Sequence, residues 1–405
     1  VNSLVPGNTY YISVDNYGGA GYRGTFRLCI NNVGTTYYSR ASGTWNTNST
    51  WSVAGYGGAA ATSFPTGGDV ALIQGYDITV SSAQSAAQID VNAATANTSL
   101  TVDNATLTVN GQLSLINSGS AFTGGIVIQN NGRINVNDVL NVTRSGGSQT
   151  FGVTVNTGST LAVNSDINFT SSGGSVAETQ LTVNGTGTVT TNRDLNLTST
   201  GGTRIHLVTN NTSQLSALRD INFTANAAGL ELIELNNTSR LNVGRNINRG
   251  ATPYGSILSN ASSSVAYNGA VYVQNVAGDA GSGGDSFTYY NLIINNTRPL
   301  NAALTLTGAL NVNGTLTLTS GILTTTSTNV LNLKNASVSG LGSTTSYISG
   351  PMTYEVASSV AGTTRNFPIG KGTDYRPMVL TVSHTSASSV IYTAEHFASS
   401  AAALG

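Results

Sequence analysis

A repeat of about 26 residues is the feature that most restricts what this chain can fold into. Between residues 128 and 273, apolar residues recur at offsets 0, +6, +8, +12 and +14 in successive copies. The copies begin 24 to 28 residues apart, at Ile128, Val155, Val183, Thr209, Leu235 and a degenerate Ser259. A repeat of this length, too short to form a core alone, is typical of solenoids.

Inside each copy, apolar and polar residues alternate over short runs, and Gly, Asn and Ser separate the runs. Period 2 within a run indicates a strand with one buried face. Each copy is therefore predicted to be one coil of an all-β, parallel β-helix solenoid with coils of about 24–28 residues. Right-handed winding is the expectation for parallel crossovers. Shorter coils on both sides extend the predicted solenoid to residues 70–348.

Charged residues make up only 8% of the 405 residues, and the net charge is −1. Stacked coils bring identical side chains about 4.8 Å apart, where like charges repel but amides and hydroxyls can pair. With no basic run, we expect no nucleic-acid binding. With no apolar stretch of about 20 residues, we expect no membrane insertion. Three histidines and one cysteine leave little material for zinc or thiol chemistry.

Outward positions of the repeat carry regular polar rows. Offset +13 is predicted to be a structural ladder of asparagines that hydrogen-bond between coils; they are Asn141, Asn168, Asn196, Asn222 and Asn248. Offset +15 holds a candidate binding face of Thr143, Thr170, Thr198 and Thr224. This Asn/Thr surface is also open to three other interpretations: N-glycosylation, binding of an ordered target such as ice or a polysaccharide, and lateral contact between solenoids.

Acidic residues in the regular coils follow the repeat. Asp166, Asp194 and Asp220 occupy one corner position, and an arginine directly precedes the latter two, so we expect corner salt bridges of small energy. Glu231 and Glu234 are the other close acids, and their surroundings in the sequence lack a histidine or lysine. A glycosidase needs two carboxylates about 5–10 Å apart, and a repeated structural position is a poor source of such a pair. We therefore expect no enzymatic activity and no catalytic residues.

Two smaller features suggest local sites. Asp279 and Asp285, in a Gly-rich loop, are weak candidates for a calcium site, and a flexible insertion between coils explains the loop equally well. No other cofactor is expected. Trp45 and Trp51 are predicted to cap the open core of the first coil, because solenoid ends need caps; a sugar-stacking platform is the alternative.

The flanking segments have the short, turn-separated strands of β-sandwiches. Residues 1–40 are predicted to be the end of a truncated sandwich, residues 41–69 a capping segment that leads into the solenoid, and residues 349–405 the start of a second truncated sandwich-type module. The chain opens without a methionine or signal peptide, so we expect a mature piece or a fragment. Cys29 is expected to be a buried thiol or to pair with a cysteine outside this chain.

Three stretches of the sequence have a recognisable pattern: Gly43–Trp51 (GTWNTNSTW), Phe64–Ile73 (FPTGGDVALI) and Phe367–Pro377 (FPIGKGTDYRP). The first two resemble the start of solenoid modules in large secreted surface proteins of Bacteroidota, and the third resembles a segment that follows such solenoids. Leu4–Ile30 is similar to the closing strands of pre-peptidase C-terminal-like sandwiches. The resemblance implies export, commonly by the type IX route, and a role in adhesion or cell-surface structure. The C-terminal sorting domain usual in that family is not visible.

These observations favour a non-enzymatic structural or adhesive segment of an extracellular, cell-surface protein or fibre. Its expected partners are neighbouring modules or other copies of the same protein, and a polysaccharide or cell surface. A carbohydrate-active β-helix enzyme, either lyase or hydrolase, and a self-assembling filament subunit are the alternatives.

Overall fold

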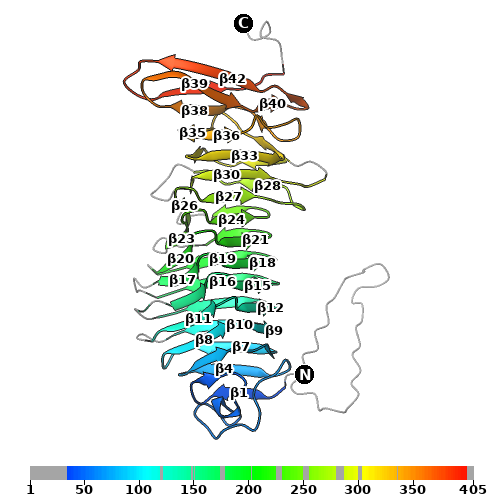
Figure 1. The fold of residues 1–405 in the computed structure, drawn as a ribbon, viewed down its shortest axis with the longest axis vertical. Helices are drawn as coiled ribbons and strands as arrows, with labels where there is room; N and C mark the ends of the chain where they lie inside the picture. Colours follow the sequence, from blue (N-terminus) through cyan, green and yellow to red (C-terminus); the bar gives the residue numbers. More distant parts are fainter. Residues whose placement is uncertain are drawn as a thin grey trace, which may run out of the picture. The chain divides into compact units, whose positions relative to one another are not determined.

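The computed structural model describes residues 34–118, 122–146, 149, 151–173, 178–201, 203–224, 230–249, 255–279, 287–299, 303–334 and 336–398. Contacts divide the chain into two units, Val1–Val33 and Gly34–Gly405. The predicted strands of Leu4–Ile30, with Cys29, lie outside the described residues. The second unit contains the solenoid, whose coils follow one another from β1 (Thr36–Ser39) to β38 (Met352–Val356) (Figure 1). It is an all-β structure of parallel stacked coils with about 9 turns, which confirms the predicted fold class.

Sheet A forms one face of the coils. Its parallel strands are β1 (Thr36–Ser39), β4 (Val70–Gln74), β7 (Gln88–Asn92), β10 (Leu113–Asn117), β13 (Leu140–Arg144), β16 (Ile167–Ser171), β19 (Leu195–Ser199), β22 (Ile221–Phe223) and β25 (Ile247–Arg249). The two-residue strand β3 (Trp51–Ser52) pairs antiparallel with β1 and ends the sheet. A one-turn 3-10 helix, η1 (Asn48–Thr50), precedes β3.

Sheet B is the longest face and contains 14 of the described strands. They are β2 (Gly43–Thr44), β5 (Asp77–Val80), β8 (Thr98–Asp103), β11 (Gly124–Gln129), β14 (Phe151–Val155), β17 (Glu178–Val183), β20 (Arg204–Thr209), β23 (Leu230–Leu235), β26 (Gly255–Ser259), β29 (Phe287–Tyr289), β32 (Leu310–Val312), β35 (Leu331–Lys334), β38 (Met352–Val356) and β43 (Val390–Ala394). All neighbours are parallel except β43, which runs antiparallel to β38.

Sheet C is the third face. It consists of β6 (Gln84–Ala86), β9 (Thr106–Val109), β12 (Arg133–Val136), β15 (Thr160–Val163), β18 (Thr188–Thr191), β21 (Gln214–Ala217), β24 (Arg240–Val243), β27 (Ser264–Tyr267), β30 (Asn291–Asn295), β33 (Thr315–Ser320) and β36 (Ser337–Ser339). Asparagines fit the corners between sheets B and C because they tolerate left-handed backbone. Asn130, Asn211 and Asn237 have φ of 54°, 60° and 56° there.

The core is the stack of inward side chains from the three faces. In each regular copy of the repeat, the strand of sheet B contributes the inward residue at offset 0. The strand of sheet C contributes those at +6 and +8, and the strand of sheet A those at +12 and +14. In the copy that begins at Val155, the inward residues Leu161, Val163, Ile167 and Phe169 are all about 99% buried. Each fully buried side chain of this size contributes roughly 1.5–3 kcal/mol of hydrophobic stabilisation. Coil-on-coil stacking joins these layers into one continuous core.

The sixth copy departs from the predicted pattern. Val271 and Val273, predicted to point inward, are 69% and 50% exposed. Sheet A ends at β25, and a new sheet D continues this side with β28 (Gln274–Val276), β31 (Ala303–Leu306), β34 (Ile322–Thr324), β37 (Ile348–Ser349), β40 (Ile369–Lys371) and the antiparallel β41 (Asp374–Tyr375). Gln274 and Val276 take the inward positions instead and are fully buried. The inward register therefore moves by three residues at this coil.

The C-terminal residues also differ from the predicted domain division. Met352–Val356 forms β38, which pairs in parallel with β35 as the next coil of sheet B. Likewise, β40 pairs in parallel with β37 in sheet D. Parallel stacking thus continues past residue 348, and the antiparallel strand β43 and the hairpin of β39 (Val360–Phe367) with β42 (Met378–His384) follow it. At the other end, β1 already belongs to sheet A, whereas the sequence predicts that residues 1–40 end a sandwich.

Candidate functional site

The outward face of sheet B carries a cluster of charged side chains between β17 and β23. Glu178 begins β17, Arg204 and His206 lie on β20, and Glu234 lies on β23. The register pairs Glu178 with Arg204 and pairs Val208, two residues beyond His206, with Glu234. Glu178 and Glu234 therefore lie on a diagonal on either side of His206. We call Glu178, Arg204, His206 and Glu234 the sheet B cluster.

His206 joins the two carboxylates. Its Nδ1 lies 3.3 Å from Glu178 Oε2, and its Nε2 lies 2.9 Å from Glu234 Oε2. The imidazole is 14% exposed. Arg204 Nη1 forms an ion pair with Glu178 Oε1 at 2.9 Å, and Gln180 Nε2 donates to Glu178 Oε2 at 2.6 Å. Glu178 thus has three partners from two adjacent coils.

These contacts decide the ionisation of Glu178. Burial by itself raises the pKa of a carboxyl group, because it disfavours the charged form. The hydrogen bond from Gln180 and the interactions with Arg204 and His206 act in the opposite direction. Their combined effect outweighs burial, so the pKa of Glu178 lies below its usual value of 4.5. Glu178 is therefore an ionised acceptor at neutral pH.

The sheet B cluster corrects the expectation that Glu234 has no histidine in its surroundings. His206 is 28 residues earlier in the chain, about one coil, and stacking brings it next to Glu234. The sequence signal is the equal spacing of Glu178, His206 and Glu234, 28 residues in each step. Glu231 lies apart from the cluster. It points into the core, is 1% exposed, and accepts a hydrogen bond from Ser199 N at 2.8 Å.

The geometry of the cluster limits what it can do chemically. Two carboxylates on one face, about 5–10 Å apart, are the minimum for glycoside hydrolysis, provided that the glycosidic bond fits between them. Here the imidazole of His206 fills the space between Glu178 and Glu234 and contacts both. In this conformation the three groups satisfy one another, and a substrate would have to displace His206 to reach both acids.

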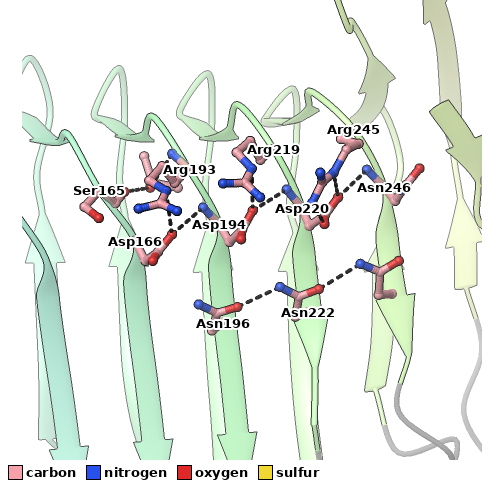
Figure 2. A network of polar contacts seen from close by, with 12 residues as sticks. Ser165, Asp166, Arg193, Asp194, Asn196, Arg219, Asp220, Asn222, Arg245 and Asn246 are labelled. Carbon is pink, nitrogen blue, oxygen red and sulfur yellow. Dashed lines mark hydrogen bonds and ion pairs between the residues drawn. The ribbon is translucent and has the colours of Figure 1, made fainter. Parts of the chain in front are cut away.

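The five predicted ladder asparagines form a hydrogen-bonded row on the outward side of sheet A. The Nδ2 of each donates to the Oδ1 of the asparagine one coil earlier. The distances are 2.8 Å for Asn168 to Asn141, 2.8 Å for Asn196 to Asn168, 2.7 Å for Asn222 to Asn196 and 2.8 Å for Asn248 to Asn222. Figure 2 shows part of this row beside the acidic corner column. Since every donor points to the preceding coil, the row has a single direction.

Beside this row, Thr143, Thr170 and Thr198 are aligned in register on sheet A and are partly exposed. Thr224 directly follows β22 and is exposed. The candidate threonine face is therefore a surface row next to the asparagine ladder.

The acidic corner residues form a second column, in which each carboxylate binds the following coil. Asp166 Oδ1 accepts from Asp194 N, Asp194 Oδ1 from Asp220 N, and Asp220 Oδ1 from Asn246 N, each at 3.0 Å (Figure 2). Each carboxylate also forms an ion pair with an arginine of the following coil, the residue just before the N–H donor. The pairs are Arg193 with Asp166, Arg219 with Asp194, and Arg245 with Asp220. The salt bridges thus join adjacent coils, and the aspartates have structural partners.

Two further asparagine rows lie at other corners. Asn184, Asn210, Asn236 and Asn260 each donate to the amide one coil earlier, beginning with Asn156, over 2.6–3.1 Å. A row that the sequence reasoning missed runs through Asn110, Asn137, Asn164 and Asn192, with N···O distances of 3.0–3.3 Å. Its signal was an asparagine at offset +9 in three successive copies.

Trp45 and Trp51 lie in the first coil and are 1% and 0% exposed. Their rings pack edge to face with centroids 5.0 Å apart. Trp45 Nε1 donates to Pro65 O at 3.0 Å, and Trp51 Nε1 donates to Trp45 O at 2.7 Å. Rings buried in this way have no free face for a sugar, so the stacking platform is wrong for this conformation.

Of the two calcium candidates, Asp285 lies outside the described residues. Asp279 N donates to Ala309 O at 2.7 Å, which ties this residue to the next coil. Among the described residues, no group of three His, Cys, Asp or Glu side chains is arranged to hold a metal ion. Within the same part of the chain, no helix has the length and apolarity needed to cross a membrane.

Comparison with protein-family models, with curated proteins and with solved structures finds no match for this chain.

Proposed function

We propose that this chain is a non-enzymatic structural segment of an extracellular surface protein or fibre, in which the solenoid is a rigid spacer. The observation that carries the proposal is the coil-to-coil locking of side chains. The amide row of sheet A and the column of Asp166, Asp194 and Asp220 both join each coil to the next. A change in the angle between two coils would break these bonds together with the backbone ladder, so bending is costly.

The use of its acidic residues further supports a structural role. The corner aspartates bind backbone N–H groups and arginines, and Glu178 and Glu234 bind the same histidine. These carboxylates therefore bind groups on adjacent coils and so help to hold the coils together. An extracellular, cell-surface location is part of the proposal and agrees with a surface rich in uncharged polar groups.

A length experiment tests the spacer role. Three extra copies of the 26-residue coil 184–209, inserted in register after Thr209, should lengthen the particle by about 14 Å, at about 4.8 Å per coil. Small-angle X-ray scattering of the original and extended chains measures the difference in maximum dimension. A dimension that does not increase, or a particle that becomes flexible, would overturn the proposal.

The carbohydrate-active enzyme remains a second candidate because two carboxylates and a histidine meet on one face. An assay on a panel of neutral and acidic polysaccharides separates the two functions. The spacer proposal predicts no depolymerisation. Cleavage that is lost in both Glu178→Gln and Glu234→Gln, but kept in the corner variant Asp194→Asn, would establish the enzyme instead.

A further inference from the structure

A hollow of about 140 Å³ lies on the outward face of sheet B, over β11, β14 and β17. Its floor is formed by the outward positions of Gly125 and Gly152, which are paired in register, and Gln180 follows them in the same row. Val127, Thr154 and Thr182 form the neighbouring row and the side wall. The hollow exists because two consecutive coils lack a side chain at this position.

Only one of the two glycines has a packing reason. A Cβ at Gly152 would lie 1.9 Å from Gln180 O, so the backbone of the next coil excludes any larger residue. A Cβ at Gly125 would have Gly152 O as its nearest neighbour at 3.4 Å, an ordinary contact, and Gly125 does not have a positive φ. Glycine inside a strand destabilises it by roughly 0.5–1 kcal/mol relative to alanine. A costly glycine without a steric reason is typical of a place where a ligand approaches the backbone.

The lining of the hollow indicates the chemistry of a ligand. Peptide groups and the Val127 side chain provide a flat floor and an apolar edge, while Thr154, Thr182 and Gln180 provide two hydroxyls and an amide. Each hydroxyl can both donate and accept a hydrogen bond. None of the lining residues is charged. The nearest acid of the sheet B cluster, Glu178, is already paired with Arg204 and His206. Its charge therefore attracts a cationic ligand in the hollow only weakly.

The sheet B cluster also positions one wall. Gln180 Nε2 donates to Glu178 Oε2 at 2.6 Å, and Glu178 is held by Arg204 and His206 from the next coil. This contact fixes the amide of Gln180 at the edge of the hollow, where its Oε1 and second N–H remain for a ligand. A pre-positioned amide spares a ligand the entropy of ordering a long side chain.

We propose that this hollow binds a single pyranose ring of a neutral glycan, with one ring face on the glycine floor and the ring hydroxyls on Thr154, Thr182 and Gln180. An uncharged ring with an apolar face and a hydroxylated edge matches both parts of the lining. The hollow is smaller than the roughly 300–1,000 Å³ of ordinary ligand pockets, so we expect weak, millimolar binding of one ring. This proposal does not depend on the spacer function.

The test uses the full chain and saturation-transfer difference NMR. The probes are methyl β-glucoside, methyl β-galactoside, methyl α-mannoside, methyl β-N-acetylglucosaminide and, as a charged probe, methyl β-glucuronide. We expect at least one neutral glycoside to bind, and methyl β-glucuronide to bind no more tightly than methyl β-glucoside. If no neutral glycoside binds, or if the charged probe is preferred, the proposal is wrong.

Variants then locate the binding. Gly125→Thr places a side chain in the hollow and should weaken binding at least about tenfold, a loss of about 1.4 kcal/mol. Its melting temperature should stay level or rise, since threonine favours strands. The matched control is Ala162→Thr, a small-to-threonine change at an outward position of β15 on sheet C, which should leave binding unchanged.

Thr154→Val provides a second variant that keeps the shape of the wall. Loss of one neutral hydrogen bond should weaken binding roughly two- to tenfold. Unchanged binding in the folded Gly125→Thr protein would overturn the location, and equal losses in Gly125→Thr and Ala162→Thr would show that binding is not at the hollow.

Discussion

The regular coils and the coil at which sheet A ends differ in how they use polar residues. From β11 to β25, the ladder amides face outward, and apolar side chains occupy most of the inward positions. Buried polar side chains such as Glu231 are scattered among those coils, whereas several polar groups gather in the core where sheet A ends. Gln274 and Asn296 are fully buried, and the Arg249 guanidinium lies 3.5 Å from the ring centroid of Phe287. We call Arg249, Tyr267, Gln274, Tyr289 and Asn296 the polar junction.

The polar junction has its own hydrogen bonds. Gln274 Nε2 donates to Val243 O at 2.8 Å, and its Oε1 accepts from Gly269 N at 3.1 Å and from Asn296 Nδ2 at 2.8 Å. The hydroxyls of Tyr267 and Tyr289 lie 3.1 Å apart. Burial raises the pKa of Tyr267 to about 12, although Tyr289, Ala277 and Arg249 act against it. Where the coil register changes, directional bonds thus replace the stacking of identical apolar residues.

The largest effect is expected in the apolar core of the regular coils. Phe169→Ala should destabilise the protein by about 3–5 kcal/mol, because a large cavity opens between coils that cannot collapse independently. Urea unfolding measures the loss, and amide hydrogen exchange shows whether it is centred on the coils of β13, β16 and β19. The outward neighbour Thr170→Ala is the control and should change stability by no more than about 0.5 kcal/mol. Similar losses in the two variants would contradict the assigned inward register.

In the polar junction, the expected loss comes from unmet hydrogen bonds. Gln274→Ala leaves Gly269 N without its partner, and a buried group left unsatisfied costs about 1–3 kcal/mol. It also breaks the hydrogen bonds of Gln274 with Val243 O and with Asn296 Nδ2, although Val243 O still accepts from Asn268 N. We expect a total of about 2–3 kcal/mol in urea unfolding. Gln214→Ala, at an exposed position of β21, serves as the matched control. If Gln274→Leu were as stable as the original chain, directional bonds would not be what holds this coil.

The amide row should show an effect that depends on position. Asn196→Ala breaks two hydrogen bonds within the row, one to Asn168 and one from Asn222. At about 0.5–1.5 kcal/mol per bond, a loss of about 1–3 kcal/mol is expected. Asn248→Ala breaks the bond to Asn222 at the end of the five-residue row, and its loss should be about half as large. Equal melting temperatures for the two variants would indicate that the amides do not act as a row.

The smallest effect is expected in how the stability of the fold depends on pH in the acid range. Because the pKa of Glu178 is lower in the folded state than its usual 4.5, its ionised form stabilises the fold above that pH. This contribution is lost as the pH falls below 4.5 through the folded pKa. Thermal unfolding of Glu178→Gln should therefore depend less on pH than that of the original chain in this acid range. Parallel curves for the two proteins would contradict the assigned shift, and Glu355→Gln on β38 is a control for the loss of an acid elsewhere.

The sequence predicts the fold well because coil stacking repeats the same local rule. Alternation places residues such as Leu161 and Phe169 inside, and an equal offset places Asn168 and Asn196 one above the other. Features that break the repeat escape this reasoning. Val271 and Val273 keep the apolar pattern, but the chain shifts its inward register by three residues before Gln274.

The sheet B cluster is hard to predict for a related reason. Glu178 is paired in register with Arg204, 26 residues later, whereas its histidine partner lies 28 residues later. To predict a contact along the diagonal, one must therefore know the register of three strands. The coil lengths cannot supply it, because they vary by at least the two residues that separate a direct from a diagonal partner. The hollow over Gly125 likewise depends on two glycines meeting in adjacent coils, which needs the register of β11 and β14.

The single direction of the asparagine row has a consequence for how such a chain changes in length. Every coil offers a carbonyl oxygen to its successor and an N–H group to its predecessor, so any regular coil fits between any two others. Duplication or deletion of a gene segment that encodes one such unit of 26 to 28 residues would preserve the asparagine row of sheet A. Recombination can therefore adjust the reach of the protein in steps of one coil, with no need to redesign either end.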